Sequence, residues 1–310
     1  MAEKKFYYGG QAVIEGVMMR GKTTLATATR HPNGEIGVDS QSLSSLYTGV
    51  WRKTPLVRGI IALIESLVLG IQTLMYSANV ALEEEKVELS GWKMWSIILA
   101  AMAFSVGVFF LLPLLVANFI KPVIGTGFVF NLIEGIIRVI LFIAYLALVS
   151  MMKDIKRVFA YHGAEHKSIN TYEAGNPLEV EYARKHSTAN PRCGTSFLFA
   201  VLIIAILVFS IFSAFKPGML LIVASRIVLL PVIAALGYEF IYFTSRHSCN
   251  PIMRVLMAPG MWLQKLTTRE PDDKQLEVAL AALKNVLQKE QPEKYPPPAQ
   301  PAPIVELPVP

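Results

Sequence analysis

The chain has 310 residues, of which 53% are hydrophobic and 17% are charged. Soluble domains average about 25% charged residues, so the composition favours a polytopic membrane protein over a soluble globular one. Two cysteines are too few for a disulfide framework. The formal net charge of +6 is assigned to loops that face anionic lipid, because no basic stripe with interleaved aromatic residues predicts nucleic-acid binding.

Residues 1–55 are predicted to form a small β-containing region in the cytoplasm. Alternating side chains flank the turn sequence HPNG at 31–34, and Asn-Gly between alternating runs is a strong hairpin signal. The glycine-rich stretch before it, 9–21, has two interpretations. It is either a strand with tight turns or a segment that brings Glu15 and Arg20 to a functional site.

Residues 56–82 have the pattern of one long helix. Polar residues recur in it every seven positions, which keeps them on one face of an otherwise apolar helix; they are Arg58, Glu65, Gln72 and Asn79. Ionisable groups inside a membrane face protein or water. The helix is therefore a fifth span with its polar stripe toward the other helices, a re-entrant or surface helix, or a plain amphipathic core helix.

Four stronger segments are predicted to span the membrane, at about 92–117, 128–152, 195–215 and 219–243. Pro113 is expected to kink the first of them. Glu134 and Arg138 in the second are spaced to neutralise each other within the bundle. The predicted fold is thus a mainly α, polytopic membrane protein, with four or five membrane-embedded helices in a helical domain at 56–250.

The distribution of lysine and arginine predicts the orientation. The loop 153–194 is rich in both, whereas the connections after the first and third spans carry only Lys121 and Lys216. The positive-inside rule then places this loop and both termini on the cytoplasmic side of a bacterial inner membrane. If 56–82 crossed the membrane, the N-terminal region would lie outside, which its basic residues oppose.

Residues 251–290 are predicted to form cytoplasmic amphipathic helices. The stretch 246–271 is half apolar and fits a position along the membrane surface. A second helix begins with Asp272 and Asp273, which favour a helix N-terminus, and its apolar face is made of Leu276, Leu280, Leu283 and Leu287. The proline-rich end, 291–310, is expected to be disordered.

The stretch 161–173 reads YHGAEHKSINTYE and carries the strongest chemical signal of the chain. On a helix, His162 and His166 lie one turn apart on one face, where both imidazoles can bind one metal ion. Glu165 is close enough to act as a general base toward water, and His-x-x-Glu-His is the inverzincin signature. The predicted cofactor is a divalent metal ion, with zinc as the first choice.

A zinc site needs at least three protein ligands, so a third must come from elsewhere in the chain. Glu239, near the cytoplasmic end of the fourth span, is preferred to His186 in the basic loop. Arg192 is the candidate for holding an anionic substrate group or a developing oxyanion. Cys193 beside it offers thiol chemistry as an alternative. The competing interpretation is that these polar residues mark the membrane interface and have no chemical role.

Five stretches resemble the YqhQ-type bacterial membrane family, which is described as a family of unknown function and predicted metal-dependent enzymes: GGQAVIEGVMMRG (9–21), YHGAEHKSINTYE (161–173), NPRCGTSF (190–197), GYE (237–239) and PGMWLQKLTTREPDDKQLEVAL (259–280). The resemblance covers nearly the whole chain short of its proline-rich end. It implies His162, Glu165 and His166 as the site, with Cys193 and Glu239 in matching motifs.

One departure from the family pattern bears on the site. Asn190 stands where many members of the family have a histidine before Pro-Arg-Cys-Gly. If that histidine is a ligand, this chain needs a substitute such as His186, or it lacks the site.

Three functions of different classes compete. The first is a metal-dependent hydrolase at the cytoplasmic membrane face, with peptide or amide hydrolysis as the analogy to inverzincins. The second is a non-enzymatic membrane scaffold or assembly factor whose polar stripe, basic loop and C-terminal helix bind membrane or cytoplasmic protein partners. The third is a transporter component, suggested by charged residues within the spans, although no internal repeat supports it.

Overall fold

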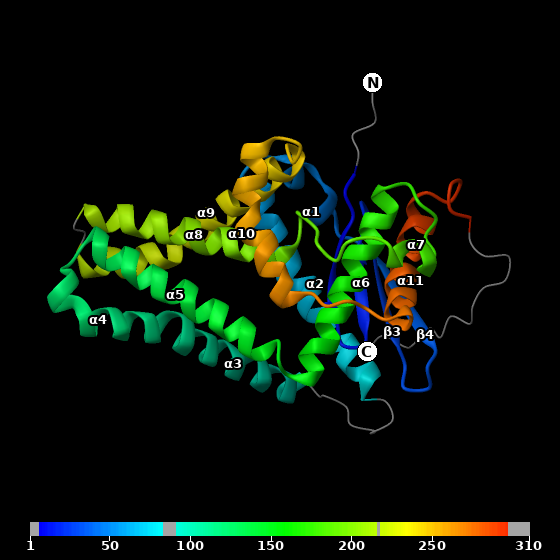
Figure 1. Ribbon diagram of the computed structural model, residues 1–310, viewed down its shortest axis with the longest axis horizontal. Helices are drawn as coiled ribbons and strands as arrows, with labels where there is room; N and C mark the ends of the chain where they lie inside the picture. Colours follow the sequence, from blue (N-terminus) through cyan, green and yellow to red (C-terminus); the bar gives the residue numbers. More distant parts are fainter. Residues whose placement is uncertain (1–5, 83–90, 216–217, 297–310) are drawn as a thin grey trace.

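The computed structural model of the protein describes residues 6–82, 91–215 and 218–296. Long helices form a bundle, and a sheet with its covering helices lies at one end of that bundle (Figure 1). The prediction of a mainly α protein with a small β-containing N-terminal region is confirmed. Most of the expected disordered tail, from residue 297 onward, lies outside the described residues.

The described part of the chain holds one antiparallel sheet with strand order β1-β2-β3-β4. Its strands are β1 (Gly9–Val13), β2 (Gly16–Arg20), β3 (Thr24–Arg30) and β4 (Ile36–Ser42). The expected hairpin is formed by β3 and β4, and Gly34 at its turn has a φ of +90°, which favours glycine. The glycine-rich stretch pairs with itself as a second hairpin, with Val13 opposite Gly16.

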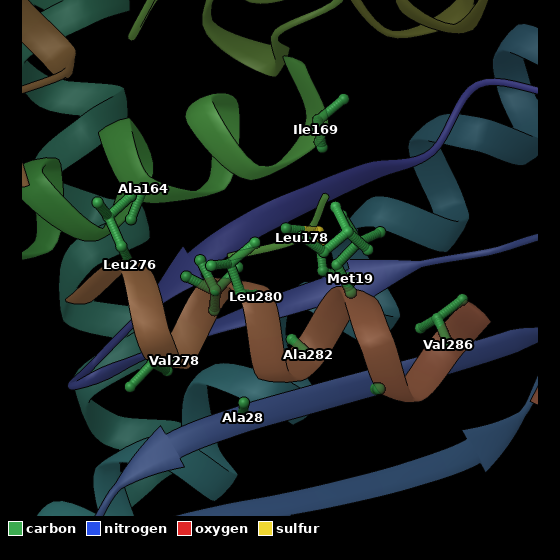
Figure 2. Packing of buried hydrophobic residues seen from close by; sticks show 14 of the residues in the cluster. Met19, Ala28, Ala164, Ile169, Leu178, Leu276, Val278, Leu280, Ala282 and Val286 are labelled. Atoms are coloured by element: carbon green, nitrogen blue, oxygen red, sulfur yellow. The ribbon is translucent and has the colours of Figure 1, made fainter. Parts of the chain in front are cut away.

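Two helices that are far apart in sequence cover one face of the sheet. α6 (Lys153–Glu173) packs on β1 and β2, and α11 (Asp273–Glu290) packs on β2, β3 and β4. Figure 2 shows Met19 and Ala28 of the strands close to α11. Asp272 begins α11 with a capping box, as its acidic start predicts. The N-terminal and C-terminal parts of the chain thus share one core, and β1–β4 with α6, α7 (Val180–Arg184) and α11 are called the sheet unit below.

The opposite face of the sheet packs on α2 (Val57–Ala81). Side chains alternate across a strand, so Met18 and Leu25 point away from α11 and join a second buried cluster with Leu69 of α2. Two short helices, α1 (Ser45–Thr48) and η1 (Val50–Lys53), lead from β4 into α2. The sheet is therefore buried on both faces in its central strands.

The bundle corresponds to the four predicted spans. α3 (Gly91–Val106) continues through a π-helical segment (Gly107–Leu111) into α4 (Leu112–Ile124), followed by α5 (Phe128–Val149), α8 (Gly194–Ala214) and α9 (Met219–Arg246). With α2, five helices among the described residues are long and apolar enough to cross a membrane, which makes the chain a polytopic membrane protein. α10 (Pro251–Thr267) then returns the chain to the sheet unit.

The π-helical segment lies where the proline was expected to kink the first span. Pro113 has no N–H to donate to the carbonyl of Phe109, and that carbonyl instead accepts a hydrogen bond from Arg138 Nε at 2.7 Å. Arg138 also forms the expected i,i+4 ion pair with Glu134. Arg226 Nη2 of α9 lies 3.4 Å from Oε2 of the same carboxylate. Glu134 therefore forms ion pairs with two arginines, one on α5 and one on α9.

Candidate metal centre

α6 places His162 and His166 one turn apart, with their ring centroids 4.4 Å apart. Each ring is held by a backbone carbonyl from another segment. The carbonyl oxygen of Thr267 lies 2.8 Å from His162 Nδ1, and that of Thr188 lies 2.5 Å from His166 Nδ1. A carbonyl oxygen only accepts hydrogen bonds, so both Nδ1 atoms carry a proton, and in the neutral rings both Nε2 atoms keep a lone pair.

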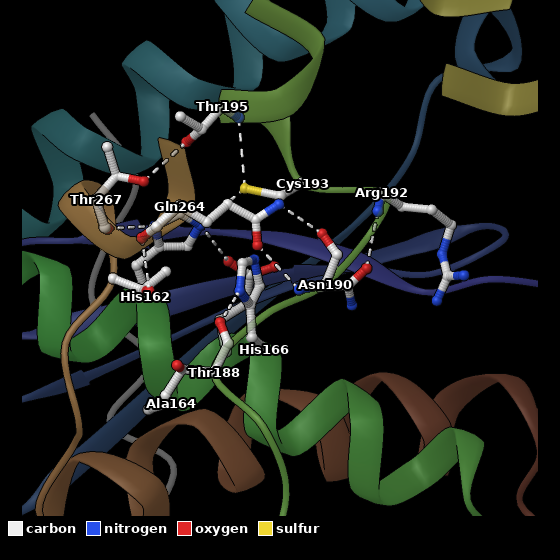
Figure 3. Close-up of polar contacts among 12 residues, drawn as sticks. His162, Ala164, His166, Thr188, Asn190, Arg192, Cys193, Thr195, Gln264 and Thr267 are labelled. Carbon is white, nitrogen blue, oxygen red and sulfur yellow. Dashed lines mark hydrogen bonds and ion pairs between the residues drawn. The ribbon is translucent and has the colours of Figure 1, made fainter. Parts of the chain in front are cut away.

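Cys193 completes a cluster with these two histidines. Its Sγ lies 3.2 Å from His162 Nε2, and one ligand atom from each of the three residues lies within 4.8 Å of the others. Figure 3 shows the thiol and both imidazoles on the same side of α6. Cys193 and His166 are buried, and His162 is partly exposed. A histidine that binds metal through one nitrogen commonly donates its other N–H to a carbonyl, and both rings have this arrangement.

The loop before α8 positions the thiol. Cys193 is the N-cap residue of α8, and its Sγ accepts a hydrogen bond from Thr195 N at 3.4 Å. Buried Gln264 of α10 fixes this loop: its Oε1 accepts from Asn190 N at 2.9 Å, and its Nε2 donates to Asn190 O at 2.8 Å and to Ser196 Oγ at 2.7 Å. Asn190 therefore shapes the loop through its backbone, and its side-chain Oδ1 accepts from Arg192 N at 3.0 Å.

Glu165 lies beside the cluster on the sheet side. Its side chain is buried, with an oxygen 4.0 Å from His162 Nε2. Burial raises the pKa of its carboxyl to about 7, although the nearby His162 and a hydrogen bond from the backbone N–H of Gly10 oppose the rise. A carboxyl group whose pKa is near neutrality and that lies next to the two imidazoles is suited to act as a general base.

Glu239 is not brought to the histidines, which corrects the preferred choice of third ligand. Its carboxylate forms an ion pair with Arg58 of α2, with Nε 2.7 Å from Oε1, and it also accepts from Leu56 N at 2.9 Å. Arg58 belongs to the polar residues that recur every seven positions in α2. The negative charge of Glu239 on α9 is therefore explained by an ion pair between two helices.

The two other loop candidates also have partners of their own. His186 Nε2 lies 3.0 Å from Asn176 Nδ2, and the ring is not part of the cluster. Arg192 pairs with Glu173 and lies over the ring of Tyr7, 4.3 Å from its centroid. Figure 3 shows the Arg192 side chain pointing away from the cluster. Its expected role in holding an anion stays a prediction.

The glycine-rich hairpin does reach the neighbourhood of α6. Glu15, at the tip of the hairpin with a φ of 52°, accepts from Arg157 Nη2 at 2.6 Å and from Tyr161 Oη at 3.2 Å. Arg20 instead pairs with Glu65 of α2 at 2.8 Å. Glu15 thus braces the first turns of α6, and Gly10 of the same hairpin lies against Glu165. In the sequence, the indication that Cys193 joins the histidines was its position directly before a predicted span.

Fold and site together define a polytopic membrane protein with a largely buried His/His/Cys cluster between its bundle and a small sheet. Residues 54–289 match the family described as Protein of unknown function (DUF1385), and the chain belongs to this family. It is 35% identical over 299 residues to the Uncharacterized protein YqhQ of Bacillus subtilis (strain 168), which covers 91% of this chain and 93% of that protein. This confirms the resemblance seen in the sequence. No solved structure shows a significant match.

Proposed function

We propose that the protein is a metal-dependent hydrolase of the membrane surface, with His162 Nε2, His166 Nε2 and Cys193 Sγ as the ligands of one divalent metal ion. The observation that carries the proposal is the convergence of three ligand atoms within 4.8 Å, with both Nδ1 atoms occupied by carbonyls. Two imidazoles and a thiolate favour zinc, and three protein ligands leave a fourth position open for substrate or water.

The chain's own residues supply the remaining steps. Zn²⁺ held by the cluster would act as a Lewis acid that activates water and polarises a carbonyl. Glu165 accepts the proton as water adds to the acyl carbon, and it returns that proton to the leaving nitrogen of an amide. The carbonyls of Thr267 and Thr188 keep the rings oriented while this occurs. The choice of an amide bond rests on the analogy between His-x-x-Glu-His and peptidases.

The proposal places the site at the cytoplasmic face of a bacterial inner membrane. The basic loop that contains α6 supports this orientation through the positive-inside rule. α6, which carries both histidines, lies at the end of the bundle next to the sheet (Figure 1). Substrate would therefore be taken from the membrane surface or from the aqueous side, and the lipid bilayer is the partner of the bundle.

Metal content of the purified full-length protein tests the proposal. Inductively coupled plasma mass spectrometry should find about one zinc per wild-type chain, and little in the double variant His162→Ala/His166→Ala or in Cys193→Ala. Cys249→Ala is the matched control, because Cys249 is exposed and lies outside the cluster. Glu239→Gln should also keep its metal. Near-zero metal in wild type grown and purified with zinc would overturn the proposal and favour a scaffold.

A second candidate function rests on the 3.2 Å contact between Cys193 Sγ and His162 Nε2. A thiol at a helix N-terminus beside an oriented imidazole is the arrangement of a cysteine nucleophile. In that case His162 would take the thiol proton, and His166 would have no ligand role. Rapid alkylation of Cys193 by iodoacetamide in wild type, unchanged by chelator and lost in His162→Ala, would favour this candidate. Protection by zinc that is lost on chelation would favour the metal centre.

A further inference from the structure

We propose that α2 lies in the plane of the membrane, with its outer face at the boundary between lipid headgroups and acyl chains, and that it does not cross the bilayer. The helix has 25 residues and is apolar enough to span, and at 1.5 Å per residue it is about 37 Å long. Length and composition therefore permit a span. The contacts of its two faces point to a surface position.

The inner face of α2 is bonded to the sheet. Arg20 Nε of β2 donates to Glu65 at 2.8 Å, and the backbone N–H of Ile14, beyond β1, donates to Ser77 Oγ at 3.2 Å. Leu69, between these two points, is buried against Met18 of β2. Twelve residues of helix separate the two polar contacts, which is about 18 Å along the axis. The middle and the second half of α2 thus rest on the sheet.

A transmembrane path would carry these sheet groups into hydrocarbon. Glu65 and its partner Arg20 lie near the middle of the helix and would sit near the centre of the bilayer. The sheet would follow, with the ion pair between Glu15 and Arg157 at its hairpin tip. Irregular backbone and open sheet edges exposed to lipid do not occur at that depth, and β1 and β4 are the edge strands of this sheet.

The outer face of α2 is apolar and exposed. Five large side chains at helical spacing form this face, which is called the outer stripe below: Ile64, Leu67, Val68, Ile71 and Leu74. They follow an i, i+3, i+4, i+7, i+10 pattern along one side. A helix with polar contacts on one side and an apolar stripe on the other is the kind that lies at a bilayer surface.

The neighbours of α2 identify lipid as the occupant of the outer stripe. α9, a candidate span, crosses the start of α2 so closely that a Cβ on Gly59 would lie 2.7 Å from Ala235 Cα. In Figure 1, α2 runs across the direction of α5 and α8, at the end of the bundle that faces the sheet. α10, which packs on α8 and α9, also exposes large apolar side chains: Ile252, Val255, Leu256 and Trp262. Tryptophan is typical of this membrane level.

Depth-dependent fluorescence quenching tests the inference in full-length protein reconstituted in phosphatidylcholine vesicles. Single cysteines carrying bimane would replace Ile64, Leu67, Ile71 and Leu74 in a Cys249→Ser background. The same background without an added cysteine measures any labelling of the remaining, buried Cys193. Because a surface helix is buried only about 5–10 Å into the headgroup region, all four labels should be quenched about twofold more by lipid with doxyl at carbon 5 than at carbon 12.

The matched control is α8, whose lipid-facing side offers Leu198, Ile203, Leu207 and Ile211 at similar spacing. Labels in the middle of that span should prefer the carbon 12 quencher, and those near its ends the carbon 5 quencher. The same deep preference for labels at Leu67 and Ile71 would overturn the inference and make α2 a fifth span. Weak quenching at all four α2 positions would also overturn it, because the outer stripe would then face protein.

Discussion

The backbone N–H of Gly10 in β1 donates a hydrogen bond to the carboxylate of Glu165 in α6. The two residues are so close that a Cβ on Gly10 would lie 3.1 Å from Glu165 Cγ and would clash with the carbonyl oxygen of Met18. A glycine in the first strand thus sets the position of the acid that we assign as general base. This contact explains why the glycine-rich hairpin and the His-x-x-Glu-His helix are parts of one site.

Gly10→Ala should therefore damage both the sheet and the site, because the new Cβ would meet the carbonyl oxygen of Met18 in β2 and the side chain of Glu165. Overpacking of this kind costs about 1–3 kcal/mol, and moving Glu165 should lower any hydrolytic rate by a larger factor than the stability change explains. Gly9→Ala is the matched control, since nothing lies within 4 Å of a Cβ there. Thermal unfolding in detergent would compare the stability of the two variants, and an amide-hydrolysis assay would compare their rates. Equal behaviour of both variants would contradict the assigned contact.

Gln264→Leu should loosen the loop before α8 that carries Cys193. The substitution removes the hydrogen-bond partner of the buried Asn190 N–H and leaves the Asn190 carbonyl oxygen with only Cys193 N, at 3.3 Å. A buried unsatisfied group costs about 1–3 kcal/mol. We expect a lower melting temperature and a weaker zinc affinity, measured by competition with a chromogenic chelator. Gln72→Leu, on an exposed position of α2, is the control. Unchanged zinc affinity with lowered stability would show that the loop does not position Cys193.

Removing the charge of Glu134 should lower the stability of the bundle more than removing the charge of Arg226. Glu134→Gln leaves both Arg138 and Arg226 without their shared acid, and breaking a buried ion pair costs about 3–5 kcal/mol. Arg226→Gln should cost less, because Arg138 keeps its ion pair with Glu134 and its bond to Phe109. Unfolding of the two variants in mixed detergent micelles gives the comparison. A larger loss in Arg226→Gln would contradict the assigned hierarchy.

Local periodicity accounts for what the sequence predicted correctly. The four long apolar runs became α3–α4, α5, α8 and α9, and Asn33-Gly34 marked a true hairpin. The pairing of Glu134 with Arg138 follows from helical spacing alone. The same spacing placed His162 and His166 on one face of α6. Each of these features depends on residues within about one turn of helix or one tight turn of chain.

The tertiary structure decided which distant residues meet. Cys193 joins the histidines because Gln264, far along the chain, holds the loop before α8. Glu239 had the right residue type and depth, but it pairs with Arg58 on α2. Sequence fixes the periodicity of each helix and not the rotation of one helix against another. Packing between helices selects that rotation, and it therefore selects the third member of the cluster.

The His-x-x-Glu-His helix was thus determined by the sequence, including its two imidazoles and its acid. Only the folded chain decided that the third partner is a thiol and that the acid rests on Gly10. Hydropathy alone cannot distinguish a surface helix from a membrane span at α2. The contacts of α2 with the sheet favour the surface helix that we propose. The physical reason is the same in each case: side-chain spacing is local, whereas burial depends on which surfaces the whole chain brings together.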